Sequence, residues 1–199
     1  VASAAVAVQH FGYDNCKLYP WDYGQEEPTI PNDGDSIYVI DVSPEKLLES
    51  WLDHDQRIVW IDHHISAIRK IDKNIPGLRM DGVAACRLAW LYFNSLATPT
   101  MIDGAIKDHV LQDLEIFEEP QAIKMVGEYD VWDLSPKVLD FQYGLVARKM
   151  LAWDKKTLAR WVNLMEDPMM ARDVEESGRW GRAYYDEQAK VTCKLKAYE

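Results

Sequence analysis

The sequence predicts an α/β protein in which a parallel sheet is flanked by helices and followed by a mainly helical part. A β-rich run at Ser36–Val42 leads directly into Ser43-Pro44-Glu45, which supplies a helix N-cap, a proline at the first helical position and an acid in the first turn. A second β-rich run follows at Arg57–Asp62. A strand, a helix and a strand at this spacing form a crossover unit, so the two strands are expected to lie parallel.

Local signals predict the elements on either side of this unit. The alanine-rich segment Val1–Phe11 is typical of a short buried helix that ends at Gly12. The segment Cys16–Tyr23 could form a strand, which Pro20 would keep short. Residues 24–35 are rich in proline, glycine and acids, which indicates a surface loop.

Beyond residue 80 the pattern is helical. Helices are expected over residues 82–96, from Thr100–Asp103 to about Phe117, after Pro120, from Ser135-Pro136, from Asp154, and from about Ala171 onward despite Gly178 and Gly181.

Composition and charge limit the classes of protein. The chain of 199 residues is 48% hydrophobic and carries a formal net charge of −11, which disfavours a partner as long and as anionic as duplex nucleic acid. The cysteines Cys16, Cys86 and Cys193 form no C-x-x-C pair, which is typical of reduced thiols in a cytoplasmic protein. No apolar run approaches the ~20 residues that a membrane helix needs. The oligomeric state is not indicated.

Polar residues follow both predicted strands. Asp41 ends the first and Asp62-His63-His64 ends the second, so they are expected at one edge of the sheet. Carboxylates and imidazoles suit Mn²⁺, Mg²⁺, Zn²⁺ or Fe²⁺. Alternation along an extended chain predicts that His63 and His64 point to opposite sides. Asp41 alone would more often cap a loop, whereas three polar groups directly after a buried strand need partners and favour a site.

The sequence resembles the DHH phosphoesterases, a family named for this tripeptide. The resemblance rests on four segments in the family's order: "VIDVS" at 39–43, "VWIDHH" at 59–64, "GVAACRLAW" at 82–90 and "GEYDVWD" at 127–133. It implies a Rossmann-like parallel sheet, then a linker helix and a smaller substrate-binding domain. On this basis residues 1–150 are expected to form the catalytic domain and residues 151–199 a helical extension or linker.

The resemblance also implies a site with two divalent ions, usually Mn²⁺, with Mg²⁺ as the alternative. Asp41, His63 and Asp130 would be metal ligands. Asp62 would orient its neighbours, and His64 would be the catalytic residue that faces the substrate phosphate or the attacking water. Two such ions can lower the pKa of a shared water and stabilise the attacking and leaving oxygens of a phosphoryl transfer.

Other polar and aromatic residues are interpreted as structural. Asp133 is the alternative to Asp130, but it lies just before an expected helix start. Trp132 is interpreted as packing or as a rim aromatic on which a base could stack. The histidines outside the motif are expected to be structural or exposed: His10, His54 and His109.

The family's first motif, His-x-Asp-x-Asp-Gly, does not occur in the sequence, although residues 1–8 resemble the helix that follows it. The expectation is therefore a fragment whose first strand and three ligands lie upstream of Val1, and whose substrate-binding domain follows residue 199. Such a fragment would bind metal weakly and turn over little substrate. The alternative is a divergent protein that has lost the site.

The leading hypothesis is a metal-dependent phosphoesterase acting on short oligonucleotides, cyclic dinucleotides or another small phosphorylated substrate. An inorganic pyrophosphatase-type relative is an alternative, as is a non-catalytic binding or assembly module with the same fold. A third possibility is an unrelated α/β protein in which the tripeptide is accidental. The coding sequence upstream of Val1 would separate an enzyme from a module.

Overall fold

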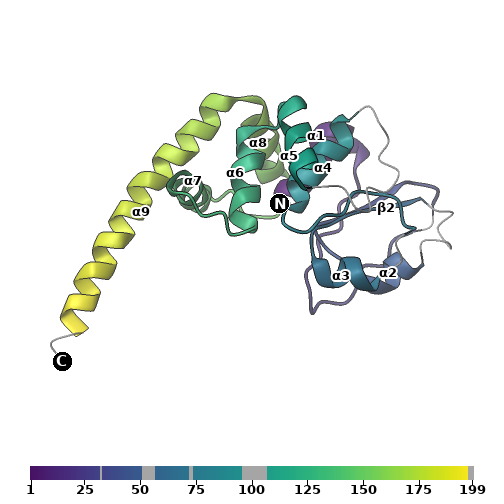
Figure 1. The fold of residues 1–199 in the computed structure, drawn as a ribbon, viewed down its shortest axis with the longest axis horizontal. Coiled ribbons are helices and arrows are strands. Elements are labelled where there is room, and N and C mark those ends of the chain that lie inside the picture. The colour runs from purple at the N-terminus through teal and green to yellow at the C-terminus, as the bar shows by residue number, and fades with distance from the viewer. Residues whose placement is uncertain (32, 51–56, 72–73, 96–106, 197–199) are drawn as a thin grey trace. The chain divides into compact units, whose positions relative to one another are not determined.

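The computed structural model describes residues 1–31, 33–50, 57–71, 74–95 and 107–196 (Figure 1). By packing, the chain divides into two compact units, Val1–Glu119 and Pro120–Glu199. The boundary expected between residues 150 and 151 was drawn from the family resemblance and stays a prediction. The start expected at Thr100–Asp103 lies outside the described residues.

The first unit contains a small parallel sheet. Strands β1 (Ile37–Ile40) and β2 (Ile58–Ile61) pair in parallel with Ile37 opposite Ile58, which confirms the predicted crossover. Residues 76–80 continue the pattern beside β2, since Asp62 forms a parallel bridge with Arg79. The described part of the chain is thus mixed α/β with a two-stranded sheet, and a larger Rossmann-like sheet stays part of the proposal below.

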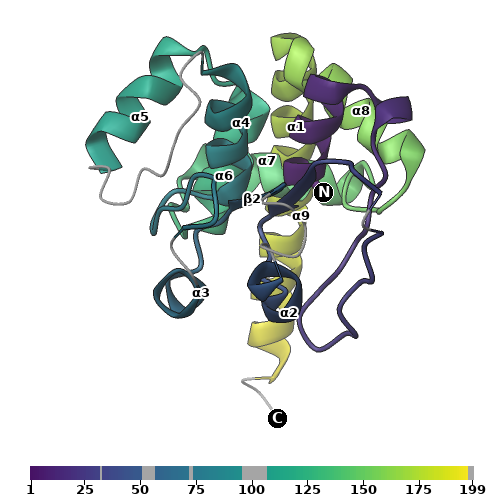
Figure 2. The ribbon, with the colours of Figure 1, turned by 90° about the vertical axis from the view of Figure 1, so that its right-hand side faces the viewer.

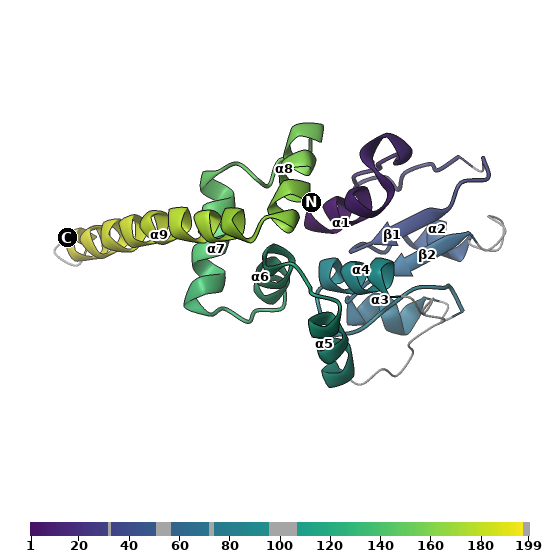
Figure 3. The same ribbon diagram turned by 90° about the horizontal axis from the view of Figure 1, so that it is seen from above.

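Helices cover both faces of this sheet. Helices α2 (Glu45–Glu49) and α3 (Ile65–Lys70) lie on one face, and α1 (Ala2–Phe11) and α4 (Ala85–Asn94) lie on the other (Figures 1 and 2). Seen from above, β1 and β2 lie side by side with α4 next to them (Figure 3). The core beneath α2 and α3 is formed by Val39, Leu48, Ile58, Trp60, Ile71 and Ile75.

The expectations for the N-terminal segment are met in part. Helix α1 ends at Gly12, whose φ of +83° belongs to the left-handed region that glycine adopts readily. The prediction of a strand at Cys16–Tyr23 is wrong. A short 3-10 helix, η1 (Tyr13–Asn15), precedes the segment, and the segment itself is irregular. Residues 24–31 and 33–35 form the expected loop.

Helix α5 (Lys107–Ile116) completes the first unit, and the segment that follows it is fastened to α4 by a buried ion pair. The guanidinium of Arg87 donates to both carboxylate oxygens of Glu119, at 2.7 Å each. The indole N–H of Trp90 donates to the carbonyl of Phe117 at 3.3 Å. These bonds hold that segment against α4.

The second unit is helical, with α6 (Gln121–Asp130), α7 (Pro136–Ala147), α8 (Lys155–Glu166) and α9 (Pro168–Lys196). Two predicted helix starts are confirmed by their caps. The hydroxyl of Ser135 accepts from the N–H of Val138 at 3.3 Å, and Asp154 accepts from the N–H of Thr157 at 2.9 Å. Within the described residues, no helix combines the length and apolar character needed to cross a membrane.

Helices α7 and α9 cross at a contact between backbones. A Cβ placed on Gly178 would lie 1.7 Å from the carbonyl oxygen of Asp140, and one on Gly144 would lie 1.9 Å from that of Val174. Asp140 is itself buried and paired with Arg182, with 2.6 Å between Oδ1 and Nε. The two glycines are therefore what allows the helices to approach so closely.

Helix α6 ends in a cap that is strained. Trp132 has a φ of +62°, in the position where glycine is the usual residue. The N–H of Asp133 donates to the carbonyl of Glu128 at 2.9 Å, which closes the cap. The side chain of Trp132 is nevertheless 82% exposed, so burial does not offset the strain.

Replacing Trp132 by glycine is expected to stabilise the protein by about 0.5 to 1 kcal/mol. Relief of a left-handed conformation, worth about 1–2 kcal/mol, exceeds the cost of glycine's greater freedom in the unfolded chain, about 0.4–1 kcal/mol. Urea unfolding would measure the difference. Asp133→Gly, at an exposed neighbour, is the control and should not stabilise. An equal or lower stability for Trp132→Gly would contradict the strain.

Candidate metal centre

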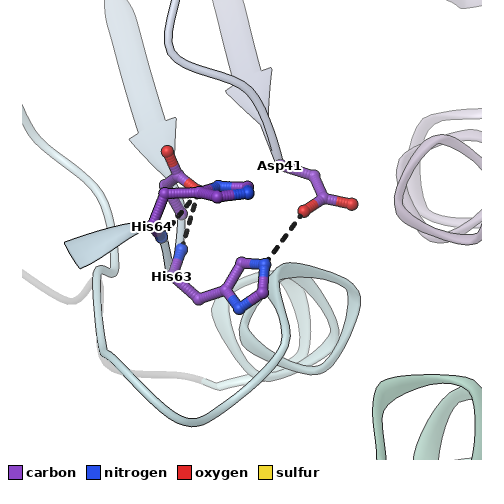
Figure 4. A group of neighbouring side chains, drawn as sticks. Asp41, His63 and His64 are labelled. Atoms are coloured by element: carbon purple, nitrogen blue, oxygen red, sulfur yellow. Dashed lines mark hydrogen bonds and ion pairs between the residues drawn. The ribbon is translucent and has the colours of Figure 1, made fainter. Parts of the chain in front are cut away.

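The ends of the two strands bring the Asp-His-His residues together with Asp41. The N–H of Asp41 donates to the carbonyl of Ile61 at 3.0 Å, which extends the parallel ladder to the edge of the sheet. One potential ligand atom from each of Asp41, Asp62, His63 and His64 lies within 4.8 Å of the others. Figure 4 shows the imidazoles of His63 and His64 extending toward the carboxylate of Asp41. We call these four residues the Asp-His cluster.

Asp41 occupies an unusual backbone position. Its φ of +67° lies in the left-handed region, which costs free energy for a residue with a side chain and is concentrated at functional sites. Its side chain is 39% exposed, with Oδ1 3.4 Å from Nε2 of His63. Oδ2 accepts from the hydroxyl of Ser3 in the first turn of α1, at 3.1 Å. The carboxylate is thus oriented from two sides and open to solvent.

Asp62 is fully buried and organises the cluster. Its Oδ1 accepts the backbone N–H groups of His63 at 2.7 Å and His64 at 3.2 Å, and it lies 2.6 Å from Nδ1 of His64. Its Oδ2 accepts from the indole N–H of Trp60 at 3.2 Å and from the hydroxyl of Ser43. With both oxygens engaged, Asp62 is placed to hold its neighbours rather than to bind a ligand directly.

The role expected for Ser43 is wrong. Helix α2 begins at Glu45 with Pro44 as its N-cap, and no side chain caps it. The hydroxyl of Ser43 points to Asp62 instead, because a buried carboxylate needs donors. The first-turn amides of α2 are satisfied from a distant part of the chain, the carboxylate of Glu27, at 3.4 and 3.3 Å.

The expectation that His63 and His64 point to opposite sides is also wrong. Their ring centroids lie 4.5 Å apart, and both imidazoles belong to the cluster. The reason is that strand β2 ends at Ile61 and helix α3 begins at Ile65, so strand alternation no longer applies to the two histidines. The side chain of His63 is 13% exposed and that of His64 is 38% exposed, which leaves His64 the more accessible of the two.

This arrangement has the chemistry of a divalent-cation site. Carboxylate oxygens and imidazole nitrogens are ligands that Mn²⁺, Zn²⁺ and Fe²⁺ share. A histidine held by a buried carboxylate through one ring nitrogen presents the other nitrogen in a fixed direction, as in many metal sites. The pairing of His64 with Asp62 fits that pattern when Nδ1 carries the proton.

The other residues considered from the sequence are not among the four of the Asp-His cluster. Asp130 is the exposed last residue of α6 in the second unit, so its part in the site stays a prediction. Asp133 is exposed, and its backbone N–H caps α6. His10 is exposed and stacks on Phe93 with 4.9 Å between centroids. His54 and the side chain of His109 lie outside the described residues.

Sequence reasoning missed Tyr23, which the loop before β1 brings to the cluster. Its ring meets that of His64 edge to face, with 5.9 Å between centroids. The Tyr23 residue is 53% exposed overall. Partial desolvation of its hydroxyl raises the pKa of that group, and the charges of Asp62 and Asp41 raise it further, while hydrogen bonding with Ser43 acts in the opposite direction. No motif surrounds Tyr23, so only the folded loop reveals its position.

Replacing Asp62 by asparagine is expected to lower the free energy of unfolding by roughly 1–3 kcal/mol. The amide has one carbonyl oxygen, so its NH₂ group must face either the indole N–H of Trp60 or the backbone N–H groups of His63 and His64. A buried donor is then left without an acceptor. Asp81→Asn, at an exposed site of the same unit, is the control. Equal urea midpoints for the two variants would contradict the organising role of Asp62.

Comparisons with known proteins do not identify the chain. No family model, no curated protein and no solved structure matches it. The class that fold and site define is a mixed α/β protein with clustered aspartate and histidine side chains at one sheet edge.

Proposed function

We propose that the chain carries the catalytic centre of a metal-dependent phosphoesterase of the DHH type. The observation that carries this proposal is the convergence of Asp41, His63 and His64 around the buried Asp62. The left-handed backbone of Asp41 is of a kind that is concentrated at functional sites, and two imidazoles lie beside its carboxylate. Together these features favour a site over local capping.

In this proposal Asp41 and His63 bind the metal. Mn²⁺ is the favoured ion and Mg²⁺ the alternative, with two ions in the full site. When bound, the ions would supply an activated water and stabilise charge on the phosphoryl oxygens. Asp62 holds the His64 imidazole through Nδ1, and His64, the more exposed of the two histidines, faces the substrate phosphate or the attacking water.

The substrate class follows from charge. A formal net charge of −11 disfavours a long anionic strand. A short oligonucleotide or a cyclic dinucleotide carries few phosphates, and the metal ions can neutralise those at the site. Pyrophosphate is the smallest substrate of the same chemistry and belongs in any test. The proposed reaction is therefore hydrolysis of a small phosphodiester.

The first test is where Mn²⁺ binds. Substoichiometric Mn²⁺ should broaden the imidazole NMR signals of His63 and His64 before that of His10, because paramagnetic broadening falls steeply with distance. EDTA should restore the signals. Equal broadening of the His10 signal would show that Mn²⁺ does not bind specifically at the Asp-His cluster.

The second test is catalysis by the full natural protein. We expect Mn²⁺-dependent hydrolysis of dinucleotides or cyclic dinucleotides that EDTA abolishes, with pyrophosphate assayed in parallel. Hydrolysis of pyrophosphate alone would favour the pyrophosphatase alternative. Metal binding at the Asp-His cluster without hydrolysis of any of these substrates would favour a non-catalytic module.

A further inference from the structure

The segment before β1 is fastened to the first unit at several points. At its base, the ammonium group of Lys17 bonds carboxylate oxygens of Asp33 and Asp35, at 2.8 Å each. In its middle, the carboxylate of Glu27 accepts two backbone N–H groups of the first turn of α2. An irregular segment tied down in this way can hold a side chain in a defined place.

A tight turn sets the direction of Tyr23 within this segment. The N–H of Gln25 donates to the carbonyl of Asp22 at 3.2 Å, and Gly24 has a φ of +87°. The ring of Trp21 meets that of Tyr23 edge to face at 5.2 Å. Tyr23 is thus supported by its own turn as well as by the cluster that it contacts.

The contacts of Tyr23 form a closed circuit around the buried carboxylate. Its hydroxyl is in hydrogen-bonding contact with Ser43, and the hydroxyl of Ser43 donates to Asp62. Asp62 is hydrogen-bonded to Nδ1 of His64. The ring of His64 in turn contacts the ring of Tyr23 at an interplanar angle of 71°. Both partners of Tyr23 are therefore bonded to the same carboxylate.

We infer that Tyr23 is a positioning residue of the metal centre, which fixes the orientation of the Asp62–His64 pair through its contacts with Ser43 and His64. This inference rests on the proposed function for its metal-binding consequence. The His64 ring is partly exposed, is held at Nδ1 by Asp62 and lies beside the His63 ring, so a further contact from Tyr23 limits how far it can swing. Asp62 also accepts from the backbone N–H of His63, the proposed metal ligand, so a loosened Asp62–His64 pair should also disturb His63. Outer partners of metal ligands commonly affect metal affinity about 10- to 100-fold.

Three variants separate this role from a general effect on the loop. Tyr23→Leu removes the ring and the hydroxyl, whereas Tyr23→Phe keeps the ring on His64 and loses only the contact with Ser43. Tyr19→Leu is the matched control, since Tyr19 belongs to the same segment and is 42% exposed. Thermal unfolding of each variant shows that the protein remains folded.

The measurements are Mn²⁺ affinity, by electron paramagnetic resonance, and the ¹⁵N spectrum of the His64 imidazole in the metal-free chain. We expect Tyr23→Leu to weaken Mn²⁺ binding about 10-fold and to average the His64 ring between its two tautomers. Tyr23→Phe should lie between Tyr23→Leu and the parent, and Tyr19→Leu should match the parent. A loss of binding without a tautomer change would mean a merely structural role and overturn the inference.

Two further outcomes would also overturn it: no change in either measurement for Tyr23→Leu, or equal changes in Tyr19→Leu. If the parent chain binds no Mn²⁺, the proposed function fails, and the His64 spectra alone then decide the inference. An averaged His64 ring in Tyr23→Leu, with a single tautomer in the parent and in Tyr19→Leu, would still support positioning by Tyr23.

Discussion

Replacement of His63 by alanine is expected to weaken Mn²⁺ binding by about 100-fold or more. Changes to outer partners of metal ligands typically cost 10- to 100-fold in affinity, so loss of a direct ligand should reach at least the upper end. The Nε2 atom of His63 lies 3.4 Å from Oδ1 of Asp41, so both atoms could be ligands of one cation. Calorimetric titration with Mn²⁺ measures the effect.

The matched control is His10→Ala, in the same unit and outside the Asp-His cluster. His10 is exposed and stacks on Phe93, so its loss should leave the Mn²⁺ affinity unchanged. If His63→Ala and His10→Ala bound Mn²⁺ equally well, His63 would not be a ligand. The full natural protein carrying His63→Ala should also lose the hydrolysis expected of the parent.

Replacement of Gly178 by alanine is expected to lower the free energy of unfolding by about 2 kcal/mol. The new Cβ would overlap the carbonyl oxygen of Asp140 and lie 2.4 Å from the backbone nitrogen of Gly144, so one helix must move. Overpacking of this kind typically costs about 1–3 kcal/mol, and contact with backbone rather than a flexible side chain places it at the upper end. Alanine's better helix propensity, about 1 kcal/mol, offsets only part of the strain.

The same helix offers a control that isolates this clash. Gly181 also lies in α9, but a Cβ there would meet nothing within 4 Å. Gly181→Ala is therefore expected to stabilise the protein by up to about 1 kcal/mol, the difference in helix propensity alone. Urea unfolding of both variants checks the prediction. Shifts of the same sign would contradict the close approach of α7 and α9.

Elements whose signals are local could be predicted from the sequence. The crossover needs only two β-rich runs with a helix start between them, and the caps at Ser135 and Asp154 need only a suitable side chain at the right position. The meeting of Asp41 with the Asp-His-His residues then follows from the geometry of parallel strands.

Features that depend on distant partners could not be predicted. Ser43 stands where a helix N-cap is expected from the sequence, but its hydroxyl donates to the buried carboxylate of Asp62. The carboxylate of Glu27 accepts from the first-turn N–H groups of the helix instead. From the sequence, Gly178 would be expected only to weaken its helix. The position of α7 is what shows that no larger residue fits there. Tyr23 reaches His64 through a loop whose path has no periodic pattern.

The bonding of Asp62 bears on when the centre forms. Its oxygens are saturated by donors from the protein itself, so the framework around the imidazoles does not depend on a cation as one of its members. Small metal-nucleated domains behave differently, because they stay unfolded until their ion binds. Here the side chains of the centre are ordered when the chain folds and not when the metal binds. The circular dichroism spectra of the metal-free and metal-bound protein should therefore superimpose.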